Sequence, residues 1–518
     1  MGYKAGSDRK QKTMMPDVMD DYVAEDNPVR VIDAFVESLN IKELGINAEP
    51  AETGRPAYNP KDMLKLFMYG YFNRLRSSRR LETETKRNIE LMWLLCTLSP
   101  DHKTIARFRK ENAKALKNVF RKFVKLCQKL GLYGNELLAI DGSKFKAVNS
   151  LDNNYNDEKL DDRLRRIDEK LELYLSELAE NDEAEGEVPK HSKEEIAAMI
   201  TELSAKKQTY ESMKARLAET GETQISTTDP EARRMKLANG ASDVCYNVQT
   251  AVDSKHKLIA DYEVTDSCND KNLLAPIAKS AKELLDVDEI AVVADNGYFV
   301  ASDIAGCILG GIIPHVSSEH DSYTFCVPAV AEEVNTPQGF GNIGKNIYVR
   351  ERNIGLCPMG VVLYPRSYRK SKNSAIYSNS KACKNCQRRE QCKPYDRELQ
   401  VKMHPSEFSK SYNDEGLHIR QFTYSPDKEL MRKRKTLVEH PFGTVKRSMD
   451  AAYCLLKGRS NVCGEFALTF LAYNLKRVIN IVGVAALLDA ISPARCLVRH
   501  FSFPRSVLPT FLRFCVLF

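Results

Sequence analysis

The sequence lacks a long hydrophobic run. The closest stretch, residues 478–491, is shorter than the about 18 apolar residues that a membrane-spanning helix requires, and Pro493 and Arg495 follow it. The first residues, MGYKAGSDRKQKTMMPD, have no apolar core of the kind that a signal peptide carries. We therefore expect a cytoplasmic protein without membrane association, whose 14 cysteines are thiols or metal ligands rather than disulfides.

A strong net charge is missing as well. The 518 residues carry a formal net charge of only +7, but this charge is unevenly spread. Residues 74–129 hold sixteen Lys and Arg against five Asp and Glu, whereas residues 152–222 are rich in acids. A basic region of the first kind suits a polyanion such as DNA, although the solvated surface of a helix has the same composition.

Helical spacing dominates residues 59–132. The segment NPKDMLKLFMYGYFNRL opens on Asn59 and Pro60, and SPDHKTIARFRK offers Ser99 as an N-cap with a proline at the first helical position. Apolar residues recur at helical intervals with basic residues between them. The pattern predicts an all-α DNA-binding domain, in which Arg107 and Arg109 contact DNA.

Two apolar runs each stop at an aspartate. Ile290–Ala294 ends at Asp295, and residues 137–140 end at Asp141. Such runs are typical of strands covered on both faces, and open α/β sheets bind ligands at the carboxyl ends of their strands. If the two strands are neighbours, the carboxylates converge on a divalent cation, Mg²⁺ or Mn²⁺. The alternative at Asp295 is an ordinary turn, because Asp-Asn-Gly is also good turn chemistry.

The order of the expected elements indicates an α/β protein. A strand, a helical insertion, two strands and then alternating helices and strands predict an RNase H-like mixed sheet core. Apolar residues three and four positions apart predict an antiparallel helical hairpin inserted into it. The expected divisions are an N-terminal, partly helical segment (1–58), a basic all-α DNA-binding domain (59–133), the first part of the catalytic core (134–316) with its hairpin (157–220), a Cys-rich insertion (317–410), a C-terminal catalytic helical part (411–484) and a tail (485–518).

A third acid would complete a two-metal site. Glu439 is the best candidate, because Lys435 and Lys446 stand four residues before it and seven after it and share its helical face. An ordinary surface ion pair is the alternative. Pro441 should start or kink a helix at this point. Two further glutamates, Glu429 and Glu465, are secondary candidates.

Four cysteines have the spacing of a structural zinc site. Cys383 and Cys386 form a C-x2-C pair, Cys392 follows six residues later, and Cys357 lies upstream. Four thiolates suit tetrahedral Zn²⁺ and leave no open coordination position, which favours a structural role. Reduced thiols without metal are the alternative reading.

Several motifs together resemble bacterial insertion-sequence transposases of the DDE class, and most closely the IS-eleven-eighty-two group. The segments that carry the resemblance are YNPKDMLKLFMYGYFNRLRSSRRLE, PDHKTIARFRK, AIDGSKFKAVNS, MKLANGASDVCYNVQTAVDSKHKLIA, VVADNGYF and VEHPFGTVKRSMDAAYCLLKGRSNVCGEFALTFLAYNLKRVINI. They occur in the same order as in that group and extend over residues 59–481.

The resemblance implies roles for individual residues. Asp141 matches the first catalytic aspartate, Asp295 the second, and Glu439 the glutamate of the C-terminal signature. Lys446 matches the lysine of that signature. Arg432 and Lys435 stand where the signature has tyrosine and arginine, so bidentate geometry is lost at the second position. Lys446, Lys435 and Arg434 are the expected DNA contacts here.

The sequence therefore predicts a DDE transposase. It would cleave double-stranded DNA at the terminal inverted repeats of an insertion sequence and join the freed ends to target DNA, as a homodimer, with Mg²⁺ or Mn²⁺ at Asp141, Asp295 and Glu439 and a structural Zn²⁺. Two alternatives remain. An RNase H-like nuclease that cuts without joining would share the three acids. A non-catalytic DNA-binding repressor derived from a transposase would fit the unusual tail and the missing tyrosine, and would bind DNA without cutting it.

Overall fold

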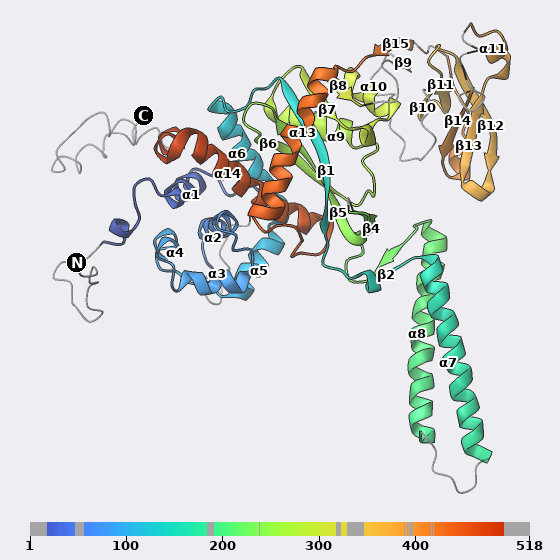
Figure 1. The fold of residues 1–518 in the computed structure, drawn as a ribbon, viewed down its shortest axis with the longest axis horizontal. Coiled ribbons are helices and arrows are strands. Elements are labelled where there is room, and N and C mark those ends of the chain that lie inside the picture. Colours follow the sequence, from blue (N-terminus) through green and yellow to red (C-terminus); the bar gives the residue numbers. More distant parts are fainter. Residues whose placement is uncertain are drawn as a thin grey trace, which may run out of the picture.

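The computed structural model describes residues 18–491 apart from 47–55, 184–190, 238, 318–322, 329–345, 388, 391, 393–396, 416 and 418. The start of the expected N-terminal segment and most of the expected tail lie outside the described residues. Within them, a helical N-terminal region, a mixed sheet, a long helical hairpin, a second sheet and a C-terminal helical region follow one another along the chain (Figure 1).

The N-terminal region is helical, as the sequence predicts. It contains η1 (Met19–Tyr22), α1 (Pro28–Glu37), α2 (Pro60–Phe72), α3 (Ser78–Thr85), α4 (Ile89–Leu94), α5 (His102–Glu111) and α6 (Ala113–Lys129). Asn59 caps α2 by accepting a hydrogen bond from the Lys61 N–H. The N-cap of α5 is Asp101 rather than the expected Ser99, because the Asp101 carboxylate accepts from both the Lys103 and Thr104 N–H groups.

The central sheet mixes antiparallel and parallel strands. Its strands are β1 (Leu137–Lys146), β4 (Arg233–Lys236), β5 (Ser242–Asp253), β6 (Ile259–Thr265), β7 (Ile290–Ala294) and β8 (Ile312–Val316). β6, β5 and β1 pair antiparallel in that order, and β7 and β8 continue parallel to β1. β4 pairs with the first residues of β5. The mixed α/β architecture expected from the sequence is therefore confirmed.

Helices cover both faces of this sheet. Leu137 and Ala139 of β1 pack against Leu437 and Val438 of α13 (Lys428–Gly443). The alternate β1 residues, which point the other way, join the main core together with α9 (Leu274–Leu285) and α10 (Ala301–Leu309). The continuous apolar pattern of β1 and β7 follows from this double coverage.

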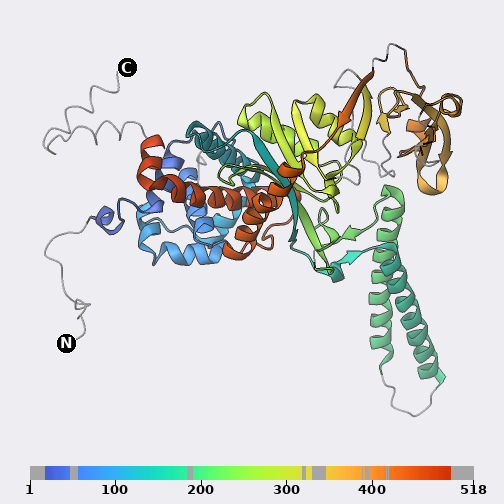
Figure 2. The same cartoon turned by 45° about the horizontal axis from the view of Figure 1, so that its top comes forward.

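A helical hairpin leaves the sheet after β1. The short 3₁₀ turn η2 (Leu151–Asn153) precedes β2 (Asn154–Tyr155), α7 (Asp157–Glu183), α8 (Lys193–Thr220) and β3 (Ile225–Ser226). β2 and β3 pair at the foot of the hairpin. Figures 1 and 2 show both helices projecting away from the rest of the protein.

A second, antiparallel sheet was not predicted from the sequence. It has the order β10 (Ile347–Val349), β11 (Ile354–Leu356), β12 (Val362–Arg369), β13 (Ser374–Ser378) and β14 (Glu398–Lys402), with η5 (Lys370–Lys372), α11 (Ser380–Lys384) and α12 (Pro405–Phe408) in its connections. The strand pair β9 (Tyr323–Pro328) and β15 (Ile419–Tyr424) links it to the body of the protein. The four predicted zinc ligands all lie in this region.

Two long helices close the chain. α13 contains Pro441 and passes into a π-helical turn, η7 (Thr444–Ser448), where the missing proline N–H disturbs the regular hydrogen bonding. α14 (Arg459–Ile491) packs against α6, α2 and α1 and bends at Gly483. Among the described residues α14 is the one helix long and apolar enough to cross a membrane, and half of its most apolar window is buried within the protein.

Candidate active site

Asp141 and Asp295 come from neighbouring parallel strands. The register of β1 and β7 pairs Ala139 with Val293. Because parallel strands advance together, two more residues along each strand bring Asp141 beside Asp295. Asp295 directly follows β7, as the sequence predicts, and its carboxylate accepts a hydrogen bond from the Gly297 N–H at 2.9 Å.

Asp141 lies inside β1 rather than at its end, contrary to the sequence prediction. The strand continues to Lys146 because β5 pairs with its backbone residue by residue, including Asp141 with Thr250 and Lys144 with Asn247. Backbone pairing does not require apolar side chains, so the end of the apolar run did not mark the end of the strand.

One guanidinium lies between the two aspartates. Arg434 Nη1 of α13 is 3.5 Å from Asp141 Oδ1 and 3.7 Å from Asp295 Oδ2. Packing of Leu437 and Val438 on β1 and β7 holds this helix against the sheet. The Asp295 side chain keeps 41% of its surface exposed, so the site is open to solvent.

The site has more negative charge than Arg434 balances. Burial raises the pKa of Asp141 to about 7; Arg434 opposes this rise, while the nearby charges of Asp295 and Asp270 add to it. An added cation would relieve this repulsion, and carboxylate oxygens are the ligands that Mg²⁺ and Mn²⁺ prefer. The donor set therefore fits a divalent ion.

Glu439 lies on the same helix as Arg434, but its carboxylate is exposed to solvent and does not contact the two aspartates. Its side chain is 65% exposed and pairs with Lys435 at 3.8 Å. No group of three or more His, Cys, Asp or Glu is placed to hold a metal ion anywhere in the part of the chain that the structure describes. The structure thus brings Asp141 and Asp295 together and places Glu439 on the adjacent helix without contact to them.

Lys446 connects η7, which continues α13, to β1. Its ammonium donates to Ser143 Oγ at 2.7 Å and to the Lys144 carbonyl at 2.8 Å, and it lies 4.5 Å from the centre of the Phe145 ring. Burial lowers its pKa, while Asp141 nearby has the opposite effect. Lys446 therefore places a positive charge beside the acidic site.

The secondary candidates for the third acid lie elsewhere. Glu465 is 1% exposed in α14, where it forms an ion pair with Arg76 at 2.5 Å and accepts from the Leu455 and Leu456 N–H groups. Glu429 is exposed in the first turn of α13. These contacts explain Glu465 as a structural residue.

Asp270 was missed in the sequence and adjoins the site. It lies in the loop between β6 and α9, in the polar segment Ser267–Asp270, which reads as an ordinary connection. A Cβ atom on Gly297 would lie 3.0 Å from Asp295 Oδ1 and 3.7 Å from Asp270 Oδ2. No local sequence pattern could have found this proximity, because the fold creates it.

The predicted DNA contacts of the N-terminal region differ in exposure. Arg107 is exposed on α5. Arg109 is only 5% exposed; it donates to Tyr71 Oη at 3.2 Å and to the Arg76 carbonyl at 3.1 Å, and it lies over the Phe67 ring. The prediction that Arg109 contacts DNA is therefore corrected, because its side chain is buried and hydrogen-bonded inside the helical region.

The four cysteines predicted to bind zinc all belong to the region of the second sheet. Cys357 follows β11, Cys383 belongs to α11, and Cys386 and Cys392 lie in the connection to β14. Burial and the neighbouring thiols raise the pKa values of Cys357 and Cys383. The four cysteines are not placed as a group that could hold a metal ion in the described part of the chain, so the zinc site stays a prediction.

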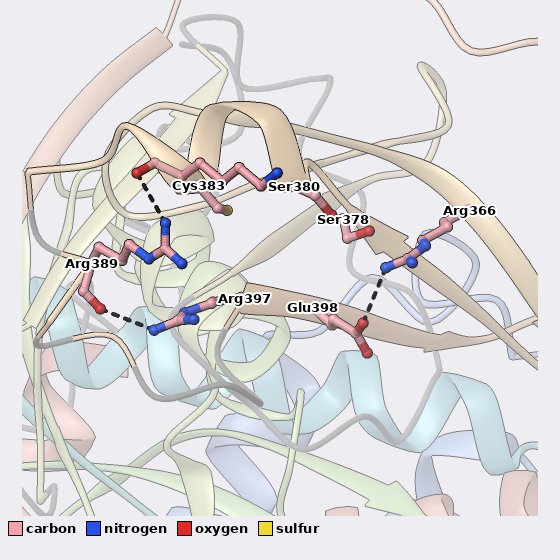
Figure 3. A pocket seen from close by; sticks show the side chains of 8 residues that line it. Arg366, Ser378, Ser380, Cys383, Arg389, Arg397 and Glu398 are labelled. Atoms are coloured by element: carbon pink, nitrogen blue, oxygen red, sulfur yellow. Dashed lines mark hydrogen bonds and ion pairs between the residues drawn. The ribbon is translucent and has the colours of Figure 1, made fainter.

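A basic pocket adjoins this cluster. It has a volume of about 260 Å³ and is lined by Arg366, Ser378, Ser380, Cys383, Lys384, Arg389, Arg397 and Glu398. Figure 3 shows Arg389 and Arg397 on the same side of the pocket, with their guanidinium groups bonded to backbone carbonyls. Arg366 pairs with Glu398 at 3.7 Å.

Comparisons with known families identify two segments. Residues 17–111 match the family described as Transposase domain (DUF772), and residues 356–479 match the family described as Transposase DDE domain. The second match includes the cysteine cluster, Glu439 and Lys446. No curated protein matches the chain.

One solved structure shows a distant similarity. It is the cryo-EM structure of the piggyBac transposase synaptic complex with hairpin DNA, at 11% identity and a TM-score of 0.27, over 94% of this chain and 84% of that one. A similarity of this size carries no structural argument.

Proposed function

We propose that this chain, which is a DNA transposase of the DDE class, cuts DNA at the ends of an insertion sequence and transfers the freed ends to target DNA. The single observation that supports the site is the parallel register of β1 and β7, with Arg434 between the two acids. The order β6–β5–β1–β7–β8 supports an RNase H-like core. The DNA substrate would be bound in the cytoplasm.

Asp141, Asp295 and Glu439 would hold divalent ions, Mg²⁺ or Mn²⁺. When bound, the ions would lower the pKa of a water molecule and of the 3′-hydroxyl that attack phosphodiester bonds. The exposed contact of Glu439 with Lys435 at 3.8 Å contributes little stability, so it would not hold the Glu439 side chain in its present orientation.

The basic side chains would position the DNA. Without metal, Arg434 offsets the negative charge of Asp141 and Asp295. Once a cation offsets that charge instead, the guanidinium can turn to bind a phosphate. Lys446 is fixed beside β1 by Ser143, so its charge would hold a phosphate at a defined place. Lys435 and Arg107 are exposed and would add phosphate contacts that give affinity without sequence choice.

Two further proposals concern assembly. Cys357, Cys383, Cys386 and Cys392 would bind one structural Zn²⁺, which four neighbouring thiols suit chemically. A homodimer would bring the two terminal repeats of the element together, because each end needs one active site. We also propose that the chain is divided into the domains expected from the sequence.

The decisive experiment uses Asp295→Asn and DNA that carries the element's terminal repeat. The variant keeps the size of the side chain but loses its charge, so we expect strand cleavage in Mg²⁺ to fall at least about a thousandfold while repeat binding stays unchanged. Asp288→Asn, a change in the preceding loop, is the matched control. Cleavage by Asp295→Asn at the rate of the wild type would refute the proposed site, and cleavage without strand transfer by the wild type would indicate a nuclease.

A further inference from the structure

Asp270 is held in one orientation by two buried amides. Its Oδ1 accepts hydrogen bonds from Asn247 Nδ2 and from Gln249 Nε2, each at 2.8 Å. Both amides belong to β5 and are at most 1% exposed. Gln249 in turn accepts a hydrogen bond from the hydroxyl of Tyr298, which lies three residues after Asp295. One network therefore links the Asp270 carboxylate to the segment that carries Asp295.

Asp270 and Asp295 both lie close to Gly297. Asp270 Oδ2 and Asp295 Oδ1 both lie within 4 Å of the position that a Cβ on Gly297 would take. The charge of Asp270 also contributes to the raised pKa values of Asp141 and Tyr298. Three aspartates from three different segments thus face one region of the site.

No ion pair balances Asp270 among the described residues. The ion pairs at this site join Arg434 to Asp141 and Asp295, and in the loop of Asp270 the paired acid is Asp266, 3.9 Å from Arg233 and 4.0 Å from Arg459. Asp270 is bound by neutral amides beside two other acids, so no cationic side chain offsets the repulsion between these carboxylates at Asp270. Such an arrangement favours a cation at its free oxygen.

A buried oxygen beside Asp270 also lacks a partner. Asn247 Oδ1 is fully buried and receives no hydrogen bond from the protein. It lies 3.0 Å from the point that a Cβ on Gly142 would occupy, and Asp270 Oδ1 lies 2.7 Å from the same point. Gln249 Nε2 lies closer still to this point, so the three side chains fill the space that a Cβ at position 142 would need. A buried acceptor without a donor is costly, and a water molecule bound to a cation would satisfy it.

We propose that Asp270 is a fourth acidic residue of the active site and binds, directly or through one water molecule, the divalent cation that Asp295 holds. Asn247 and Gln249 are positioning residues, because they fix one oxygen of Asp270 and direct the other to the metal. The inference rests on the proposed function, since it assumes a cation at Asp295.

The test measures Mn²⁺ binding to the full-length protein without DNA, by the electron paramagnetic resonance signal of free Mn²⁺. We expect Asp270→Asn to weaken binding at least about tenfold, because it removes a charged ligand while keeping the amide contacts of Oδ1. Asp270→Glu should recover part of the affinity. The matched control is Asp266→Asn, which removes an equal charge from the same loop and should leave binding unchanged. Thermal unfolding of each variant shows whether the fold is kept.

The outcomes separate this inference from the proposed function. If Asp295→Asn weakens Mn²⁺ binding but Asp270→Asn does not, the role of Asp270 is refuted and the proposed function stands. If Asp270→Asn and Asp266→Asn weaken binding equally, the effect is one of net charge and the inference also fails. If Asp295→Asn binds Mn²⁺ like the wild type, both the shared cation and the proposed function fall.

Discussion

At the scale of single residues, Arg434 has the most informative position. It contacts both Asp141 and Asp295, so it occupies the place where positive charge is most needed. The protein without metal is stabilised by this contact, since two neighbouring carboxylates repel each other. A cation that enters the site must compete with the guanidinium.

Replacing Arg434 separates its effect on metal binding from its effect on DNA cleavage. We expect Arg434→Gln to bind Mn²⁺ about tenfold more tightly, because a unit charge a few ångströms from the ion is removed, and to cleave DNA more slowly, because a phosphate contact is lost. Titration with Mn²⁺ and a cleavage assay give the two values. Arg432→Gln, an exposed neighbour, should leave Mn²⁺ affinity unchanged. Weaker metal binding by Arg434→Gln would contradict a competing guanidinium.

At the scale of elements, α14 connects the two ends of the chain. It packs along α6 and α2, and its buried Glu465 forms an ion pair with Arg76 from the loop after α2. Arg76 also donates to the carbonyls of Asp450 and Tyr453, which precede α14. The N-terminal helices are thereby fixed to the segment that follows α13 and η7.

This buried ion pair should matter for stability. Glu465→Gln leaves Arg76 charged, buried and without its partner, so the free energy of unfolding should fall by about 3 kcal/mol. Urea denaturation followed by circular dichroism measures this change. Glu263→Gln breaks a more exposed pair with Lys117 and should cost less than about 1 kcal/mol. Equal effects of the two substitutions would show that burial does not strengthen the first pair.

The elements also show what the sequence could predict. The run Ile290–Ala294 has a clear pattern, and β7 and Asp295 appear where it places them. In the second sheet β10 and β11 have only three residues each, and β12 mixes apolar and charged residues, so no periodicity in the sequence indicated these strands. Arg109 carries the same charge as Arg107, and only the tertiary fold decides that it is buried. Asp270 joins the site through the packing of a loop, which single-sequence patterns do not encode.

At the scale of the whole molecule, the second sheet stands apart from the proposed active site. It has two small clusters of buried residues, one of Tyr348, Leu363, Ala375, Tyr377, Val401 and Met403 and one of Val349, Ile354 and Leu356. Clusters of this size contribute limited hydrophobic stability, so a metal at the cysteines would add substantially to it. Loss of that metal should affect this sheet without disturbing the acids on β1 and β7.

Removal of one thiol tests whether the metal at the cysteines stabilises the second sheet without affecting the acids on β1 and β7. We expect purified wild-type protein to contain one zinc ion per chain and Cys386→Ser to contain much less, because three thiolates bind Zn²⁺ more weakly than four. Atomic emission spectrometry measures the zinc, and limited proteolysis should then cut Cys386→Ser within residues 346–415. Mn²⁺ binding should stay unchanged. Cys268→Ser, an exposed cysteine in another loop, is the control. Wild-type protein without zinc would refute the site.

The hairpin of α7 and α8 has a mechanical consequence. Its foot is fastened by the β2–β3 pair and by the contact of Leu160, Leu217 and Ile225. At about 1.5 Å per residue the 28 residues of α8 form a lever roughly 42 Å long. A swing of about 10° at the pivot moves its far end by about 7 Å, or roughly two base-pair steps of DNA. Small adjustments near β1 are therefore magnified at the remote tip.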